Sequence, residues 1–152
     1  MALFEQISED IKSAMKARDK VRLETLRNIK KVFLEAKTAP GANDTLEDAD
    51  ALKIIQKLAK QGKESAATFA QQNRQDLADA ELAQVAVIES YLPQQLSEAE
   101  IEERVRAIIA ETGATTMRDM GRVMGLASKQ MAGVADGRVI SEIVKKLLAG
   151  AA

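Results

Sequence analysis

The chain has 152 residues, of which 46% are hydrophobic and 30% charged, and its formal net charge is −1. This balance is typical of a folded globular protein and predicts no global attraction to nucleic acid. Because the chain contains neither Cys nor His, disulfides, thiolate nucleophiles, zinc sites and the commonest general base are excluded, and we expect no metal and no cofactor.

Nothing in the sequence indicates secretion or membrane insertion. The N-terminus has no basic segment followed by an apolar core, so we expect no signal peptide. No apolar run approaches the roughly 18 residues that a bilayer-spanning helix needs. We therefore expect a cytoplasmic protein that makes no membrane contact.

Helical periodicity dominates the first 92 residues. Apolar residues recur at spacings of three and four, which predicts helices over residues 2–18, 20–37, 46–73 and 77–92. The short loop between the third and fourth helices predicts a long antiparallel hairpin. Gly62 lies on the apolar seam of the third helix, where a missing side chain favours close approach by another helix over solvent exposure.

Two helix starts and two apolar stripes give testable local predictions. Asp19 is expected to be the N-cap of the second helix, and Thr45 with Asp48 resembles a capping box at the start of the third. Met15 and Leu82 follow the helical repeat and are expected to face inward. The basic residues of the second helix are interpreted as a solvated face, with a docking surface as the alternative.

A second group of helices follows Pro93. Residues 93–96 read as a linker, Ser97 with Glu100 forms a capping-box pattern, and Gly113 is expected to end the fifth helix. Two further helices follow over about residues 116–133 and 136–149, and no segment alternates as a strand would. The sequence thus predicts an all-α protein, with a four-helix N-terminal domain over 1–92 and a small three-helix domain over 97–152.

The sixth helix separates its chemistry into two faces. At 100° per residue, one side carries Met117, Met120, Met124, Ala127 and Met131, and the opposite side carries Arg118, Arg122, Gly125 and Lys129. The methionines are interpreted as core, because Met adapts to irregular gaps. A glycine facing solvent in mid-helix is destabilising by roughly 1 kcal/mol, so either close packing or approach by a phosphate backbone is expected at the basic face.

The seventh helix extends the basic character of this region, since Arg138, Lys145 and Lys146 lie away from its apolar residues. Residues 113–152 hold six basic and three acidic residues. Two basic helix faces favour salt-sensitive contact with an RNA backbone. The scarcity of aromatic residues disfavours recognition of single-stranded bases by stacking.

Several motifs resemble one known family. The segments LFEQISEDIKSAMKARDKVRLETLRNIK, YLPQQLSEAEIE, DMGRVMG and ADGRVISEIVKKLL resemble the YqeY family, and the resemblance covers nearly the whole chain. The C-terminal part is similar to the tail domain of the B subunit of the tRNA-dependent aspartyl/glutamyl amidotransferase (GatB). That resemblance implies a three-helix tail-like domain that helps to hold tRNA.

Three functions follow as hypotheses. The first is a non-catalytic tRNA- or RNA-binding accessory module related to the tRNA-dependent amidotransferase. The second is a protein-interaction adaptor that docks on an amidotransferase or an aminoacyl-tRNA synthetase. The third is the activity often attached to the family, a carbon–nitrogen ligase that uses glutamine as amido donor. No catalytic residues are assigned, because neither a nucleophile with its partners nor a Gly-rich phosphate loop is visible.

Overall fold

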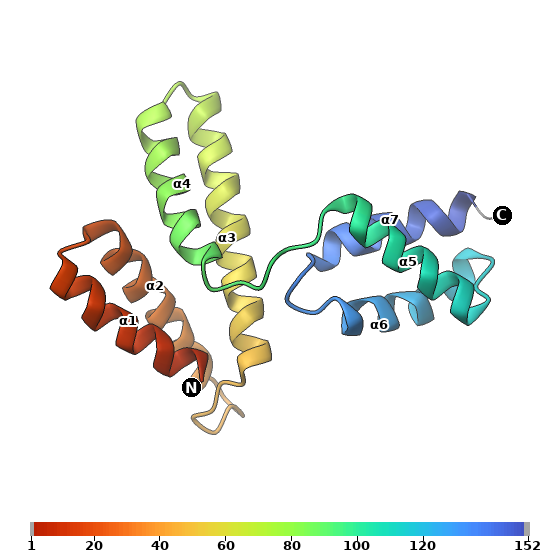
Figure 1. Cartoon of the computed structure of the whole chain (residues 1–152), viewed down its shortest axis with the longest axis horizontal. Helices are drawn as coiled ribbons and strands as arrows, with labels where there is room; N and C mark the ends of the chain where they lie inside the picture. Colours follow the sequence, from red (N-terminus) through yellow and green to blue (C-terminus); the bar gives the residue numbers. More distant parts are fainter. Residues whose placement is uncertain (1, 151–152) are drawn as a thin grey trace. The chain divides into compact units, whose positions relative to one another are not determined.

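The computed structural model describes residues 2–150, which divide between two compact units with their boundary between Leu92 and Pro93. Regular structure in the described part of the chain is entirely helical, with seven α-helices and one short 3-10 turn (Figure 1). The all-α prediction is confirmed. Each unit has an apolar core of its own.

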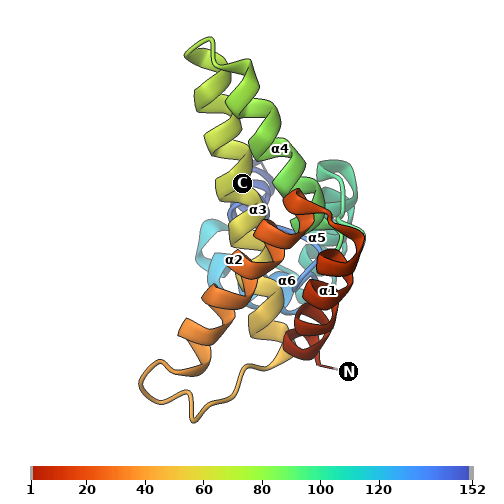
Figure 2. The same cartoon turned by 90° about the vertical axis from the view of Figure 1, so that its left-hand side faces the viewer.

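The N-terminal unit consists of two helical hairpins. Its helices are α1 Leu3–Ala17, α2 Lys20–Lys37, α3 Asp48–Gln71 and α4 Gln75–Glu89. The first hairpin pairs α1 with α2, the second pairs α3 with α4, and α2 also contacts α4 (Figure 2). The core that joins the hairpins contains the fully buried side chains of Ile7, Leu26, Ile29, Phe33 and Ile55.

The predicted start of α2 is confirmed and that of α3 is wrong. The Asp19 carboxylate accepts a hydrogen bond from the backbone N–H of Arg22 at 3.1 Å, as an N-cap does. In contrast, α3 begins at Asp48, and the Thr45 hydroxyl donates to the Ala42 carbonyl at 2.6 Å. Asn43 and Asp44 adopt left-handed φ angles of 52° and 55° and form a turn. Because of this turn, the helix begins only after the residue where the capping box would start it.

The contact at Gly62 confirms that a missing side chain lets two helices approach closely. A Cβ atom placed at Gly62 would lie 2.5 Å from Cγ2 of Val85 on α4, well inside van der Waals contact. Val85 and Ala78 are buried along the same seam, opposite Ala59 and Ala66 of α3. The hairpin is therefore held by small and β-branched side chains at short range.

Two residues expected to face inward lie outside the core. Leu82 is 47% exposed because the buried row of α4 runs through Ala78, Val85 and Ile88, and Leu82 lies one row farther out. Met15 is 52% exposed because Ala14, one residue earlier, faces the core of the unit. Helical spacing alone does not determine which residue at the edge of an apolar stripe is buried. The surface of the partner helix determines it.

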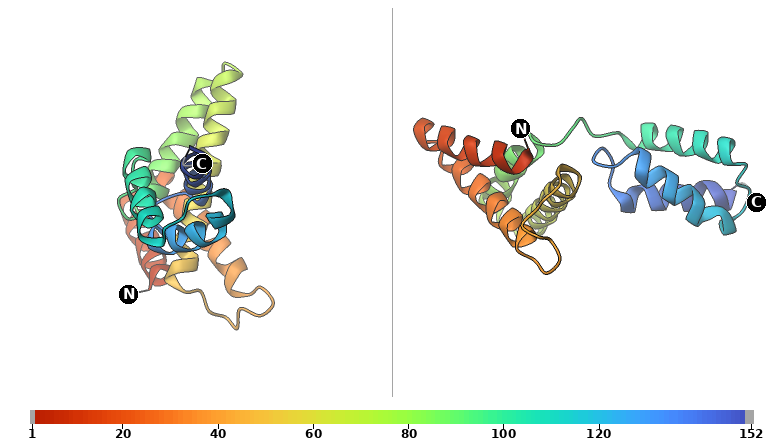
Figure 3. Two further views of the ribbon diagram at one scale, coloured as in Figure 1. Left: turned by 90° about the vertical axis from the view of Figure 1, so that its right-hand side faces the viewer. Right: turned by 90° about the horizontal axis from the view of Figure 1, so that it is seen from below.

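The C-terminal unit contains the other three helices around a second core (Figure 3). They are α5 Glu98–Thr112, α6 Met120–Gln130 and α7 Gly137–Gly150. The Ser97–Glu100 capping box is present, and Gly113 ends α5 with a left-handed φ of 69°. Leu96 packs on this core and its N–H donates to the Val134 carbonyl at 2.9 Å, so the end of the expected linker belongs to the C-terminal unit.

Candidate nucleic-acid interface

The candidate face begins at a capped 3-10 turn. Residues Met117–Asp119 form this turn, and a reciprocal capping box joins Thr116 and Asp119, as the sequence predicts. The expectation of one continuous helix from about residue 116 is wrong at its start, because α6 begins only at Met120. A 3-10 turn has three residues per revolution, so the α-helical repeat does not predict which way the Met117 side chain faces. This side chain is 47% exposed.

Asp119 is the electrostatic anchor of this turn. Its carboxylate accepts hydrogen bonds from the backbone N–H groups of Thr115 and Thr116 at 3.0 and 3.3 Å. These bonds, led by that from Thr115, lower the pKa of Asp119 below its ordinary value, and the nearby Arg122 adds to the effect. The carboxylate therefore stays ionised and fixes the loop that enters α6.

Arg122 joins the first turn of α6 to the end of α5. Its guanidinium donates to the Thr112 carbonyl at 3.1 Å and lies 3.5 Å from the Asp119 carboxylate. The side chain is still 56% exposed, and a guanidinium carries five N–H donors. Arg122 is thus held in place while further donors remain directed at solvent.

Gly125 occupies the middle of the outer face of α6. Within 4 Å of a Cβ placed there, nothing in the described part of the chain would be met, and the same is true of Gly121. Packing against a helix of its own unit therefore does not explain Gly125. The buried side of α6 contains Ala127 and Val123, both fully buried. Val123 was not among the residues predicted to be buried, because the expected apolar stripe was defined by the methionines.

Lys129 completes this face two helical turns beyond Arg122. It is exposed, and among the described residues it has no ion-pair partner. The same holds for the side chain of Arg118 in the 3-10 turn. We call Arg122, Gly125 and Lys129 the α6 basic face; the three residues lie within about 60° of arc at 100° per residue.

The three candidate residues of α7 are exposed as well, but their charges are engaged differently. Arg138 lies 3.7 Å from the carboxylate of Glu142, one turn along the helix. Lys146 interacts with Glu102 on α5, whose pKa is lowered first by Arg106 and then by this lysine. Lys145 shares a helix face with Arg138, seven residues away.

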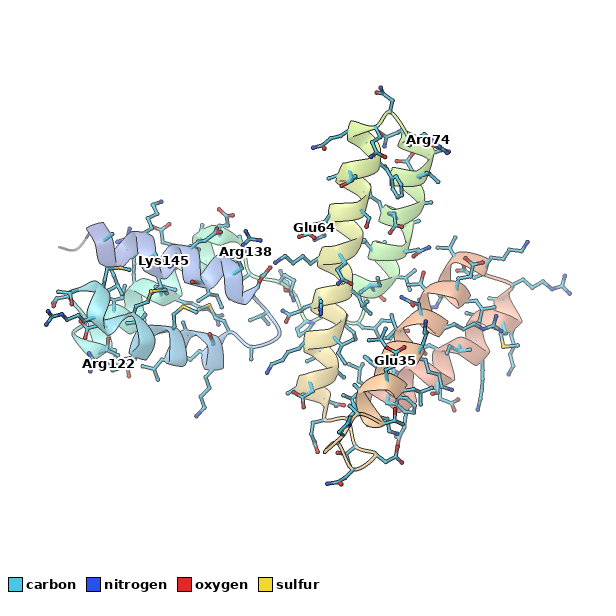
Figure 4. All side chains as sticks on the ribbon, turned by 180° about the vertical axis from the view of Figure 1, so that it is seen from behind. Glu35, Glu64, Arg74, Arg122, Arg138 and Lys145 are labelled. Carbon is cyan, nitrogen blue, oxygen red and sulfur yellow. The ribbon has the colours of Figure 1, made fainter. Side chains whose placement is uncertain are left out.

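The candidate residues form two groups, one on α6 and one on α7. The helices α6 and α7 run in opposite directions, so Arg122 and Arg138 lie at opposite ends of the C-terminal unit (Figure 4). Each group offers two cations that are seven residues apart, which is about 10 Å along a helix. This spacing fits contact with an extended anion better than enclosure of a small one.

No group of three or more acidic residues in residues 2–150 is placed to hold a metal ion. A shallow hollow of about 310 Å³ on α3 is lined by Gln61, Glu64, Ser65, Thr68 and Phe69. All five residues belong to one helix, and Figure 4 shows Glu64 on its surface. No helix in the described part of the chain is long and apolar enough to cross a bilayer.

A half-buried polar network was missed by the sequence reasoning. The Tyr91 hydroxyl donates to the Asp10 carboxylate at 2.6 Å and accepts from the Arg22 guanidinium at 3.3 Å. Burial, and then the hydrogen bond to Asp10, raise the pKa of Tyr91 far above its ordinary value. The three residues lie far apart in sequence, so only the tertiary structure joins the end of α4 to α1 and α2.

Comparison with known proteins places the chain in a family. Residues 4–148 match the family described as Yqey-like protein. The chain belongs to the YqeY-like family. It is 28% identical to the Altered inheritance of mitochondria protein 41 of Pyrenophora tritici-repentis, over 94% of this chain and 79% of the relative. The protein of the same name from Clavispora lusitaniae is 30% identical, over 86% of this chain and 74% of the relative.

Proposed function

We propose that this YqeY-like protein is a non-catalytic RNA-binding module whose ligand is tRNA or a tRNA–enzyme complex. The observation that carries the proposal is the α6 basic face: two cations two turns apart, with an exposed glycine between them that nothing in its own unit covers. The C-terminal part is similar to the tail domain of the B subunit of the tRNA-dependent amidotransferase. A functional relation to that enzyme, which this similarity implies, is part of the proposal.

The chemistry of the face suits a phosphate backbone. Lys129 supplies a mobile point charge, and Arg122 supplies a planar fork of donors that its bond to Thr112 already orients. Gly125 leaves backbone between them open, so a bulky anion can approach the helix surface closely. Contacts of this kind position a duplex by its shape and carry no base sequence.

The residues of α7 extend this surface. Lys145 is exposed and, within residues 2–150, has no ion-pair partner, whereas Arg138 and Lys146 are partly neutralised by carboxylates. We therefore rank Lys145 above the other two as a phosphate contact. The α6 and α7 residues would meet different phosphates of one RNA.

A second candidate, the adaptor function, rests on α4. From Ala80 to Val87 the exposed side of this helix carries only uncharged residues, and Leu82 is 47% exposed there. An uncharged helix face with small residues suits contact with a helix of an amidotransferase or a synthetase. Recovery of such an enzyme with the wild-type chain after nuclease treatment, and its loss with Leu82→Glu, would favour this function.

The remaining expectations stay predictions. A carbon–nitrogen ligase activity would require glutamine-dependent release of ammonia by the purified chain, and no residue set in the proposal supplies it. A cytoplasmic location is likewise a proposal, because the relatives are named as mitochondrial proteins. Fractionation of cells that express the untagged chain at its natural level would decide the location.

The test of RNA binding is a titration of tRNA at several salt concentrations, followed by fluorescence anisotropy. We expect affinity to fall steeply with salt, and to fall at every salt concentration in the Arg122→Glu/Lys129→Glu variant. Because Arg122 also bonds to Thr112, Lys129→Glu alone is a second variant that disturbs no such contact.

The matched control is Arg27→Glu/Lys31→Glu, which makes the same charge change on the exposed side of α2. We expect this control to bind tRNA nearly as well as the wild type. Absence of binding at low salt would refute the proposal. Equal losses in the control and in the α6 variants would refute the assignment of the contact to α6.

A further inference from the structure

A run of lysines on α3 forms a second basic surface, on the N-terminal unit. Between Asp50 and Glu64 the chain contains four lysines and no acidic residue. Lys53, Lys57 and Lys60 follow one another at steps of four and three and so share one helix face. The surrounding region, residues 38–92, has a net negative charge, with five basic and nine acidic residues. A charge count over this longer segment therefore does not reveal the lysines.

The fold leaves two of these lysines, Lys53 and Lys57, facing solvent, and we call this pair the α3 lysine stripe. Lys53 and Lys57 are exposed and, in the described part of the chain, form no ion pair. The fourth lysine, Lys63, is turned aside and lies 3.0 Å from the Glu89 carboxylate of α4. The lysine next to the partner helix is thus paired, whereas Lys53 and Lys57 remain available.

We propose that the α3 lysine stripe binds the phosphate backbone of the same RNA that the α6 basic face contacts. This inference rests on the proposed function and adds a second contact surface to it. The two lysines of the stripe lie four residues apart, about 6 Å along the helix. Repeated short rows of cations suit a ligand whose charges are themselves regularly spaced.

The composition of the stripe favours a nucleic acid over a protein or a membrane. None of the exposed large hydrophobic side chains in the described residues lies on α3; they belong to α1, α2, α4 and the C-terminal unit. Protein interfaces are depleted in Lys and depend on buried aromatic or apolar anchors. Helices that bind at a membrane surface insert apolar side chains beside their basic residues. The stripe has cations alone.

Two surfaces on one chain act together. Once one unit holds the RNA, the other unit binds it as an intramolecular event at high effective concentration. The phosphate contacts of both units therefore add in the salt dependence of a single binding step. Loss of either surface should weaken binding without abolishing it.

The experiment measures the salt dependence of tRNA binding by the full chain and by Lys53→Gln/Lys57→Gln. Lys60 stays unchanged, because it makes a further interaction within the fold. We expect the slope of log affinity against log salt to fall in magnitude by about two, one for each lost phosphate contact. At low salt the affinity should fall by roughly tenfold.

The matched control is Lys16→Gln/Lys20→Gln, which removes two exposed lysines from α1 and α2 and should leave the slope unchanged. If the wild type binds but Lys53→Gln/Lys57→Gln keeps its slope, this inference is overturned and the α6 proposal stands. If the control loses as much slope, net charge explains the effect and the inference is also overturned.

Two further outcomes separate the alternatives. No binding by the wild type at low salt would overturn the proposed function together with this inference. Loss of binding to vesicles that contain phosphatidylserine in Lys53→Gln/Lys57→Gln, with unchanged tRNA binding, would assign the stripe to a membrane and overturn the inference. Circular dichroism confirms that each variant is folded before it is titrated.

Discussion

Gly62 and Gly125 are both glycines inside helices, yet their surroundings are opposite. At Gly62 a Cβ would collide with Val85 of α4 at 2.5 Å, whereas at Gly125 nothing within 4 Å in the described part of the chain would be met. The first glycine is explained by the fold of its own unit. At the second, no packing within the described part of the chain explains the missing side chain. A glycine inside a helix is therefore evidence for function only where no intramolecular packing accounts for it.

The largest effect is expected at Gly62. Gly62→Ala would force Val85 or α4 to move, because a β-branched side chain has little rotamer freedom. Overpacking of this kind lowers the free energy of unfolding by about 1–3 kcal/mol, which exceeds the gain of at most ~1 kcal/mol from helix propensity. Urea denaturation, with hydrogen exchange to localise the change to the N-terminal unit, measures it.

The control for Gly62 is the double variant Gly62→Ala/Val85→Ala, which removes the colliding methyl groups. It should be more stable than the sum of the two single changes predicts. A Gly62→Ala protein at least as stable as the wild type would contradict the close approach of α3 and α4.

Gly125→Ala should have the opposite sign. The added methyl group enters open space, so the C-terminal unit is expected to gain about 1 kcal/mol in unfolding free energy. The same variant should bind tRNA more weakly, because the methyl group keeps the phosphate backbone away from the helix. Gly121→Ala is the control, since it is equally open and should stabilise without loss of affinity. Tighter tRNA binding by Gly125→Ala would argue against close approach.

Arg122 has a structural contact within the fold, whereas Lys129 has no ion-pair partner among the described residues. Arg122→Gln loses an ion pair at the surface and a bond to the Thr112 carbonyl, so a loss of about 0.5–1 kcal/mol in stability is expected. Lys129→Gln should leave stability unchanged. Both should reduce tRNA affinity by a similar factor. Thermal unfolding and anisotropy on the same samples test this, and equal stability losses would contradict it.

The smallest expected effect is on the stability of the protein at acidic pH. The pKa of Asp119 is lowered by hydrogen bonds that exist only in the fold, so its stabilising contribution is complete above the ordinary value of 3.8 and is lost as pH falls through the lowered pKa. NMR titration of the Asp119 carboxyl carbon should give a midpoint below 3.8. Asp119→Asn should remove this part of the acid dependence, and an ordinary midpoint would contradict the capped turn.

The helical class and most helix ends follow from the amino-acid sequence alone. Asp19, Ser97 with Glu100 and Gly113 act within one helical turn, so their hydrogen bonds depend only on neighbours in the chain. The apolar repeat also identified most buried rows, because helical spacing fixes which residues share a face. The same reasoning placed the cations of the α6 basic face at the surface.

Helical periodicity leaves several features of the molecule open, and the packing of the helices fixes them. The packing buries Ala14 and not Met15, and Val85 and not Leu82, because each buried row depends on the surface that the partner helix presents. It joined Tyr91 to Asp10 and Arg22 across more than 60 residues, which no local pattern encodes. It also engaged Lys63 with Glu89 and Arg122 with Thr112. Which cations remain available to a ligand is therefore a property of the packed molecule, because pairing depends on distances that only the fold creates.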